Sequence, residues 1–342
     1  MTEGTGRMLI DAALLSADAA EAAEQAAQRE AEGYGAVWSF EGPNDPFFPL
    51  VLASQKTERV LLGTAIAVAF ARNPMICAHI AQDLQRLSKG RFVLGLGTQV
   101  KPHIERRFSQ PWSRPVARMR EFVKAIRAIW SCWKGDGRLD FRGEFYTHTL
   151  MTPMFSPKPG PWGDPAIYLA GVGEKMVEMV GEVADGFLVH PFHSKSYLEA
   201  VTLPALERGL AAGGRTRKDL TVSCQTIVAL GSNDAEVERA RRKARGQISF
   251  YGSTPAYRGL LDHHGHAGLQ ETLNRMSKQG QWGEMMALIS DELFDEIAVS
   301  GTPEQVAAKL RARNTFADRT TLVLYNETSP DAPVELVRKL TS

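Results

Sequence analysis

A glycine turn in the middle of the chain has residue types that suggest chemistry. Gly171-Val172-Gly173 lies between an apolar segment and a helical pattern that begins at Glu174. Glycines at the start of a helix let backbone amides approach an anion, and the helix dipole favours a phosphate there. Met176 stands where the third glycine of a dinucleotide fingerprint would be, so the turn does not predict a Rossmann-type site. A plain tight turn, with Glu174 satisfying the helix dipole, remains the alternative.

Histidines and one carboxylate are the other candidates. His190 and His193 flank Pro191-Phe192 at the end of an apolar segment, where they could contact a substrate or be ordinary hydrogen-bonded loop residues. Glu41 is the only strand-end carboxylate in the first four strand units. The run His263-His264-Gly265-His266 has no pair at the i, i+4 spacing and no cysteine nearby. We therefore expect no metal site.

The motifs of enzymes that use a protein nucleophile are missing. The sequence contains no Gly-x-Ser-x-Gly elbow, no Walker loop and no pair of strand-end carboxylates typical of glycosidases. This pattern fits an enzyme in which a cofactor performs the difficult step.

The composition predicts a soluble globular protein with a small-molecule substrate. Of the 342 residues, 44% are hydrophobic and 23% charged, and the net charge is +1, which favours neither nucleic acid nor a membrane as partner. The longest apolar run, Val60–Ala71, is shorter than the roughly 18 residues of a spanning helix. The three cysteines are widely separated, and the amino-terminal residues lack the apolar segment of a signal peptide. We expect a cytoplasmic protein.

Eight short apolar segments alternate with helical patterns, for example the helix expected over Ala19–Glu32 after Asp18. The expected strands are Met8–Leu15, Ala36–Glu41, Val60–Phe70, Arg91–Leu96, Ala166–Ala170, Gly186–His190, Leu220–Leu230 and Thr320–Tyr325. Continuous apolar strands between helices predict a parallel sheet covered on both faces, and eight units favour a closed (β/α)8 TIM barrel. We expect residues 1–342 to form one domain, with insertions after strands 4 and 7 in the long connections 98–164 and 231–319.

A helix expected to begin at Pro115 and to end before Gly135 carries many large apolar side chains. They recur at the helical period, so we assign them to the core and not to a ligand site. They are Met119, Phe122, Val123, Ile126, Trp130 and Trp133. In a TIM barrel the active site lies at the carboxyl ends of the strands, which selects the strand-end residues above.

Four pairs of segments at these strand ends, in order along the chain, carry a family resemblance. They are 38–41 with 45–47, 63–66 with 72–74, 91–97 with 108–111, and 170–173 with 184–186. Together they make the chain from Met8 to Tyr325 similar to the bacterial luciferase-like superfamily of flavin and deazaflavin oxidoreductases, which fold as β/α barrels. The details look most like the branch that uses coenzyme F420.

The resemblance implies a cofactor site. It implies a non-prolyl cis peptide bond at Ala65-Ile66, in a bulge of strand three behind the cofactor ring. It implies that backbone amides of the turn hold the cofactor phosphate, and that Glu41 and His103 act as catalytic or polar cofactor contacts. The complete expected cofactor set is Ala65, Ile66, Gly97, Thr98, His103, Gly171, Val172, Gly173, Glu174 and Lys175.

Two departures from the sequence pattern of this superfamily narrow the class of substrate. Gly42 stands where sugar-phosphate-oxidising relatives have a histidine, and Val100 stands where they have a glutamate, so sugar-phosphate oxidation is not expected. The loops after strands six and seven are apolar to aromatic, which suggests a hydrophobic or aromatic substrate. The expected substrate contacts are His190, Phe192, His193, Phe250 and Tyr251.

The resemblance therefore implies an F420-dependent hydride-transferring oxidoreductase, and a homodimer because dimers dominate the family. Two alternatives remain open at this point. One is an FMN-dependent monooxygenase supplied by a separate reductase, and the other is a barrel that binds a cofactor without turnover. The residues themselves do not separate F420 from FMN.

Overall fold

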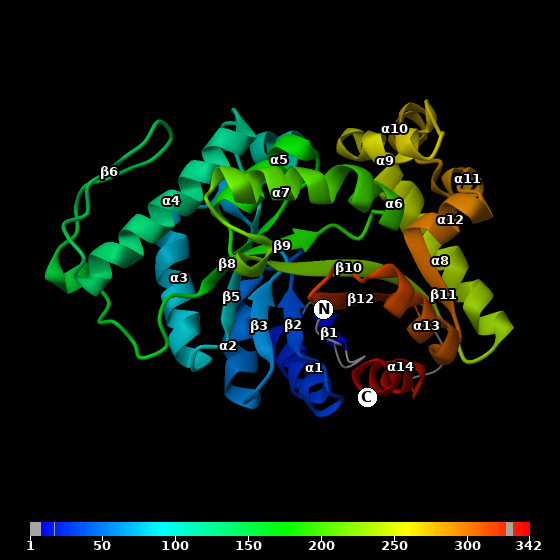
Figure 1. The fold of residues 1–342 in the computed structure, drawn as a ribbon, viewed down its shortest axis with the longest axis horizontal. Helices are drawn as coiled ribbons and strands as arrows, with labels where there is room; N and C mark the ends of the chain where they lie inside the picture. The colour runs from blue at the N-terminus through cyan, green and yellow to red at the C-terminus, as the bar shows by residue number, and fades with distance from the viewer. Residues whose placement is uncertain (1–7, 17, 326–330) are drawn as a thin grey trace.

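Eight parallel strands close into a barrel in the computed structural model of the chain, which describes residues 8–16, 18–325 and 331–342 (Figure 1). β12 pairs with both β10 and β1, and β9 pairs with β10, which closes the sheet. This confirms the expected TIM barrel. The barrel strands in spatial order are β1 (Leu9–Ala13), β2 (Ala36–Ser39), β3 (Leu61–Thr64), β5 (Phe92–Gly97), β8 (Ala166–Ala170), β9 (Gly186–Val189), β10 (Thr221–Leu230) and β12 (Arg319–Tyr325).

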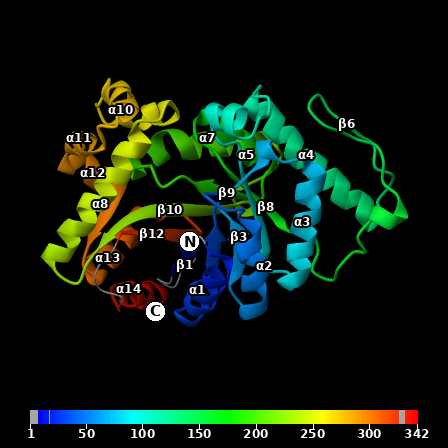
Figure 2. The same ribbon diagram turned by 180° about the vertical axis from the view of Figure 1, so that it is seen from behind.

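Helices surround the barrel and cover the outer face of its strands, as the views from both sides show (Figures 1 and 2). The Asp18 side chain accepts hydrogen bonds from Ala20 and Glu21 N–H and so caps α1, as the sequence indicates. The surrounding helices are α1 (Ala19–Ala31), α2 (Phe47–Lys56), α3 (Pro74–Leu87), α4 (Pro115–Lys134), α5 (Glu174–Val183), α7 (Leu203–Ala212), α13 (Pro303–Arg313) and α14 (Asp331–Thr341). The apolar face expected on α4 is buried, which confirms its assignment to the core.

The third strand is shorter than its apolar sequence suggests. The expected strand Val60–Phe70 is divided into β3, the two-residue strand β4 (Ala67–Val68) and a short 3-10 turn, η1 (Ala69–Ala71). The division falls at Ala65-Ile66, whose peptide bond is cis. The hydrophobic pattern continued through the segment because both parts are buried, so it could not mark the break.

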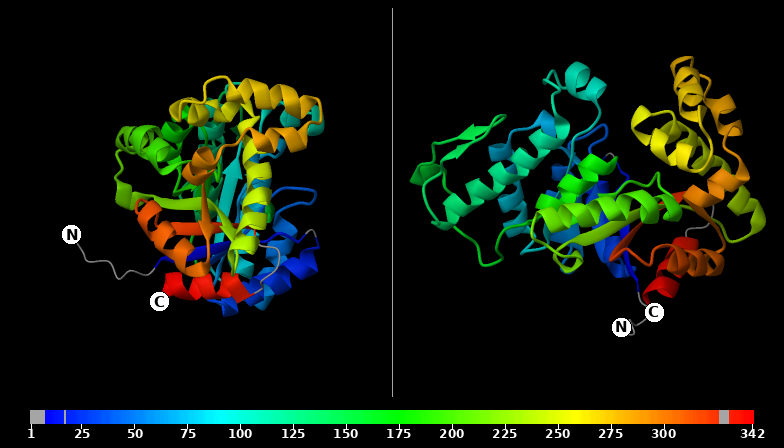
Figure 3. Two further views of the ribbon diagram at one scale, coloured as in Figure 1. Left: turned by 90° about the vertical axis from the view of Figure 1, so that its right-hand side faces the viewer. Right: turned by 45° about the horizontal axis from the view of Figure 1, so that its top comes forward.

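Two insertions extend the barrel, in the connections expected from the sequence. After β5 come the one-turn helix η2 (His103–Arg107), α4, and an arm with the short strands β6 (Phe141–Arg142) and β7 (Thr147–His148) that projects from the body (Figure 1). After β10 come the insertion helices, a group of five that stands at the same end of the barrel as the segment following β5 (Figure 3). They are α8 (Asp234–Gly252), α9 (Arg258–His263), α10 (Leu269–Lys278), α11 (Trp282–Ala287) and α12 (Asp291–Ile297).

A strand that the sequence analysis missed follows the insertion helices. β11 (Ala298–Gly301) pairs in parallel with the last four residues of β10. It lies outside the barrel, and among the described strands it pairs with β10 alone. Its four residues are too few to show a period of their own.

A buried ion pair and a pair of aromatic side chains fill the interior of the barrel. Arg319 donates two hydrogen bonds to the carboxylate of Asp11, at 2.9 and 2.5 Å. Trp38 donates its indole N–H to the same carboxylate at 3.1 Å and packs on Tyr168, with ring centroids 6.0 Å apart. Burial alone would lower the pKa of Arg319, but the Asp11 carboxylate raises it, so the guanidinium stays charged. Burial raises the pKa of Asp11, against the lowering effects of Arg319 and Trp38. Within the described residues, no helix has the length and apolar character that crossing a membrane requires.

Candidate active site

The bulge after β3 lies at the carboxyl end of the barrel strands. Ala65 N–H donates to the carbonyl oxygen of Ser39 at 2.7 Å, and Glu41 N–H donates to the carbonyl oxygen of Ile66 at 3.1 Å. These bonds attach the bulge to the end of β2. Ala65 and Ile66 remain half-buried, whereas the strand residues on either side are buried, so an apolar backbone surface faces the mouth.

Glycines on β5 make room for this bulge. A side chain at Gly95 would collide with the carbonyl oxygen of Thr64, only 1.6 Å from the position of an added Cβ. At Gly97 an added Cβ would lie 2.9 Å from the side chain of Ile66. Thr64 further fixes the two strands, because its hydroxyl donates to the Gly95 carbonyl at 2.6 Å and accepts from the Gly95 N–H at 2.9 Å. Thr98 follows this strand end and is partly exposed.

Glu41 is buried against the bulge. Its carboxylate accepts the N–H of Val68 at 2.7 Å and a guanidinium N–H of Arg72 at 2.5 Å. Arg72 also reaches Asp45 at 2.7 Å. Burial alone would lower the pKa of Arg72, but the two carboxylates raise it. The Glu41 side chain is therefore committed to holding the backbone of the bulge.

The turn before α5 is open, as a phosphate site requires. The helix begins at Glu174, and among the described residues no side chain caps it. Gly173 has φ +81°, a conformation that L side chains rarely adopt, and nothing lies within 4 Å of where its Cβ would be. The side chains of Glu174 and Lys175 are turned to neighbours, Arg208 at 3.0 Å and Glu178 at 3.5 Å. The backbone N–H groups of residues 173–175 are therefore the donors available to an anion, beside the half-exposed Val172.

His103 lies in η2 and is exposed. Basic residues surround it. Arg107 of the same turn donates to the carbonyl oxygen of Gly42 at 3.0 Å, which joins the segment after β5 to the loop after β2. Lys101 pairs with Glu105 at 3.8 Å. The structure thus places His103 at the rim of the barrel and not in its interior.

The two histidines after β9 have different surroundings. His190 follows Gly186 and Leu188 at the two-residue spacing of a strand, and both of these face the barrel interior near Tyr168. His190 therefore faces the mouth. His193 is 3% exposed; its Nδ1 donates to the carbonyl oxygen of His190 at 2.9 Å, and its Nε2 lies 3.4 Å from the Cys224 thiol. The structure brings His190 to the site and leaves His193 in the wall.

Burial keeps both imidazoles neutral. It lowers the pKa of His190 to about 3, and that of His193 to about 3 with a further contribution from the nearby Arg313. Burial also raises the pKa of the Cys224 thiol to about 12, so the Cys224–His193 contact joins a thiol to a neutral imidazole and is not an ion pair.

Known proteins are similar to this chain in sequence and in architecture. A sequence profile of the luciferase-like monooxygenase family matches residues 4–319. The chain belongs to this family. An uncharacterized protein of Mycobacterium tuberculosis is 52% identical over 310 residues, which cover 91% of each chain. A putative coenzyme F420-dependent oxidoreductase of the same organism is 28% identical over 303 residues, covering 84% of this chain and 86% of the relative.

A solved structure confirms the fold of this luciferase-like chain. The coenzyme F420-dependent tetrahydromethanopterin reductase from Methanopyrus kandleri superposes with a TM-score of 0.77 and covers 98% of each chain. Its sequence identity of 18% supports the shared barrel and no more.

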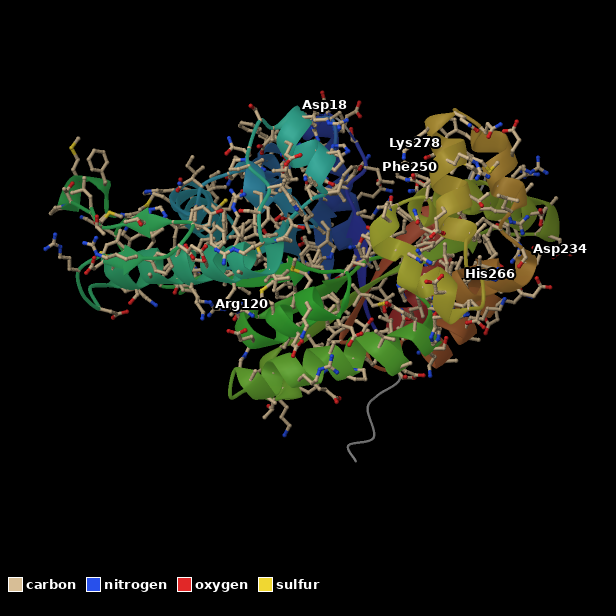
Figure 4. All side chains as sticks on the ribbon, turned by 90° about the horizontal axis from the view of Figure 1, so that it is seen from above. Asp18, Arg120, Asp234, Phe250, His266 and Lys278 are labelled. Carbon is tan, nitrogen blue, oxygen red and sulfur yellow. The ribbon has the colours of Figure 1, made fainter. Side chains whose placement is uncertain are left out.

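An aromatic cluster from the insertion completes the mouth of this luciferase-like barrel. Tyr251 and Tyr257 both pack against His190, with ring centroids 4.7 and 4.6 Å away, and against the buried Phe192. Phe250 is 49% exposed and lies, with Lys278, on the edge of the insertion nearest the rest of the barrel, whereas Asp234 lies at the far edge (Figure 4). Exposed Leu15 and Phe40 follow β1 and β2. The strand ends thus expose apolar surface to a ligand.

Sequence reasoning missed two residues of this arrangement. Arg72 was read only as part of a family segment, although a buried strand followed by an arginine could have indicated a partner for Glu41. Tyr257 lies in the aromatic segment after strand seven but is not among the expected substrate contacts. Its contact with His190 joins residues 67 positions apart, which no local pattern shows.

Proposed function

We propose that this chain is an oxidoreductase that transfers a hydride between coenzyme F420 and a hydrophobic or aromatic small molecule. One observation carries the proposal: the half-exposed bulge at Ala65-Ile66 and the open turn before α5 lie at the ends of the two strands that flank β5. β4 pairs with β5, and β5 pairs with β8, which leads into Gly171-Val172-Gly173. An apolar backing suits a planar ring, and free N–H groups at a helix start suit a phosphate.

Each part of the site then has a task. Ala65 and Ile66 back the ring, and the N–H groups of residues 173–175 bind the ribityl phosphate. Bound F420 would supply the hydride exchange itself, while the chain orients the reactants and excludes water. The relative named as F420-dependent supports this cofactor over FMN.

For Glu41 we propose a positioning role, because its carboxylate already serves the bulge through Val68 and Arg72. Glu41→Gln would then loosen the bulge without removing a proton donor, so the pH dependence of hydride transfer should stay unchanged. A proton partner would instead lose one limb of the pH profile on this substitution.

A fluorescence titration of the purified chain with F420 and with FMN tests the cofactor. We expect F420 to bind at least about 10-fold more tightly than FMN. We expect Gly173→Val to weaken F420 binding by about 10-fold or more, because a β-branched side chain cannot keep φ +81° and the N–H groups turn away.

Gly135→Val is the matched control, since Gly135 has φ +90° and equally free space but lies at the carboxyl end of α4. It should leave F420 binding unchanged. Tighter binding of FMN, with oxygen consumption by the reduced flavin, would replace the proposal by the monooxygenase alternative. Binding of F420 without hydride transfer to any of a panel of hydrophobic carbonyl compounds and alcohols would favour a non-catalytic barrel.

We also propose a homodimer whose interface includes α2 and α3. These neighbouring helices expose apolar side chains, among them Phe48 at 68% and Ile76 at 54%. Sedimentation velocity should give twice the mass of one chain, and Phe48→Glu should give monomers. Leu150→Glu, at an exposed position of the arm after β7, should leave the dimer intact. A monomeric wild-type chain, or dissociation by Leu150→Glu alone, would contradict this interface.

A further inference from the structure

A hydrogen bond between His190 and Tyr257 joins the barrel mouth to the insertion. Nε2 of His190 lies 2.9 Å from the Tyr257 hydroxyl oxygen, and the two rings stack with an interplanar angle of 25°. Tyr257 lies in the short turn η6 (Pro255–Tyr257), between α8 and α9 of the insertion. The contact therefore spans two separate parts of the fold.

The backbone identifies the donor in this bond. Phe192 N–H donates to Nδ1 of His190 at 3.1 Å. A backbone N–H can only donate, so Nδ1 carries no proton. The neutral imidazole then has its proton on Nε2 and donates it to the Tyr257 oxygen.

The proton of the Tyr257 hydroxyl is consequently free for another acceptor. Within residues 8–16, 18–325 and 331–342, His190 is the hydrogen-bond partner of this hydroxyl and no other acceptor is in reach. Tyr257 is half-buried, so a ligand oxygen at the mouth can accept this proton in place of water.

The surroundings select a neutral acceptor. Phe192 and Tyr251 flank the pair, and burial keeps His190 uncharged and raises the pKa of Tyr257. No cationic side chain in the described part of the chain forms a hydrogen bond with either residue of the pair. A carboxylate would lose more hydration free energy here than one hydroxyl donor returns. A neutral carbonyl oxygen loses less, and one hydrogen bond from Tyr257 compensates that loss.

We propose that Tyr257 donates a hydrogen bond to the carbonyl oxygen of the substrate and that His190 positions this hydroxyl. The inference rests on the proposed function and narrows its substrate to ketones or aldehydes with an apolar body. In the reducing direction the carbonyl carbon accepts the hydride, and the electron pair of the C=O double bond moves to oxygen. The oxygen takes the Tyr257 proton, which water replaces, and the His190 Nε2–H bond stabilises the phenolate that forms transiently. The carbonyl is reduced to an alcohol and the cofactor is oxidised.

The test uses acetophenone labelled with carbon-13 at its carbonyl, together with reduced F420. We expect wild-type enzyme to lower the infrared C=O stretching frequency of bound acetophenone. We also expect it to convert acetophenone to the alcohol. Tyr257→Phe should abolish the frequency shift and lower the rate about 100-fold, the effect of removing one donor to a developing oxyanion. Tyr197→Phe, a control at a half-buried tyrosine of helix α6 (Lys195–Tyr197), should change neither.

His190 is tested by two replacements. His190→Gln keeps a side-chain N–H that can reach Tyr257 and should retain most of the activity, whereas His190→Leu should behave like Tyr257→Phe. An unchanged rate and frequency in Tyr257→Phe would overturn the proposal. If wild-type enzyme binds F420 but neither binds nor reduces acetophenone, the carbonyl assignment is wrong. If it does not bind F420, the proposed function fails, and the infrared shift without cofactor still decides the role of Tyr257.

Discussion

Asp11→Ala is expected to lower the free energy of unfolding by about 3–5 kcal/mol. Asp11 is fully buried and Arg319 is 9% exposed, and the two form a bidentate ion pair between β1 and β12, the strands that close the barrel. Removing the carboxylate leaves the guanidinium buried without its counter-charge and leaves the Trp38 N–H without an acceptor. Urea unfolding of the cofactor-free protein, followed by tryptophan fluorescence, measures the loss.

An exposed ion pair provides the control. Glu304 and Lys339 lie 2.5 Å apart with side chains 77% and 34% exposed, and Glu304→Ala should leave the free energy of unfolding almost unchanged, because water screens the pair. The double variant Asp11→Leu with Arg319→Met should be more stable than Asp11→Ala, because it removes both charges. A loss below about 1 kcal/mol for Asp11→Ala would show that water reaches the guanidinium.

The sequence was sufficient for the barrel because each strand and helix carries its own local signal. Asp18 and Gly33 mark the two ends of α1, and the apolar period of α4 identifies its buried face. Eight such units predict a closed sheet, since parallel strands must be covered by helices on the outside. The break in the third strand could not be predicted from such local signals. It lies at Ala65-Ile66, and the family resemblance implied it, whereas the hydrophobic pattern continues across it.

The site was harder to predict because its contacts are long-range. The turn at Gly171-Val172-Gly173 was identified because a glycine turn before a helix is a local signal. Two features depend on distances between side chains that no spacing in the sequence encodes. Arg72 binds the Glu41 carboxylate, and His193 points into the wall of the barrel. The position of His190 at a strand end predicts that it faces the mouth, but its hydrogen-bond partner Tyr257 lies on another element.

The neutral state of His190 and His193 makes a second large effect expected. Both have folded pKa values of about 3, whereas an unfolded histidine has a pKa of about 6.5. The unfolded chain therefore binds more protons as the pH falls below about 6.5, and the folded state loses stability in that direction. Each histidine should contribute a loss of about 2 kcal/mol between pH 7 and pH 5, or about 4 kcal/mol for the pair.

The comparison of variants isolates this effect from the carboxylates, which titrate in all of them. Wild-type protein should lose about 4 kcal/mol more of its unfolding free energy between pH 7 and pH 5 than the double variant His190→Gln with His193→Gln. The control with His103→Gln and His263→Gln replaces exposed histidines and should behave as wild type. An equal loss in all three proteins would mean that the two imidazoles accept protons in the folded state. That result would place a proton on Nδ1 of His190, where the Phe192 N–H donates, and would contradict the tautomer from which the alignment of Tyr257 is inferred. The stability measurement and the substrate experiment therefore test the same protonation state from two directions.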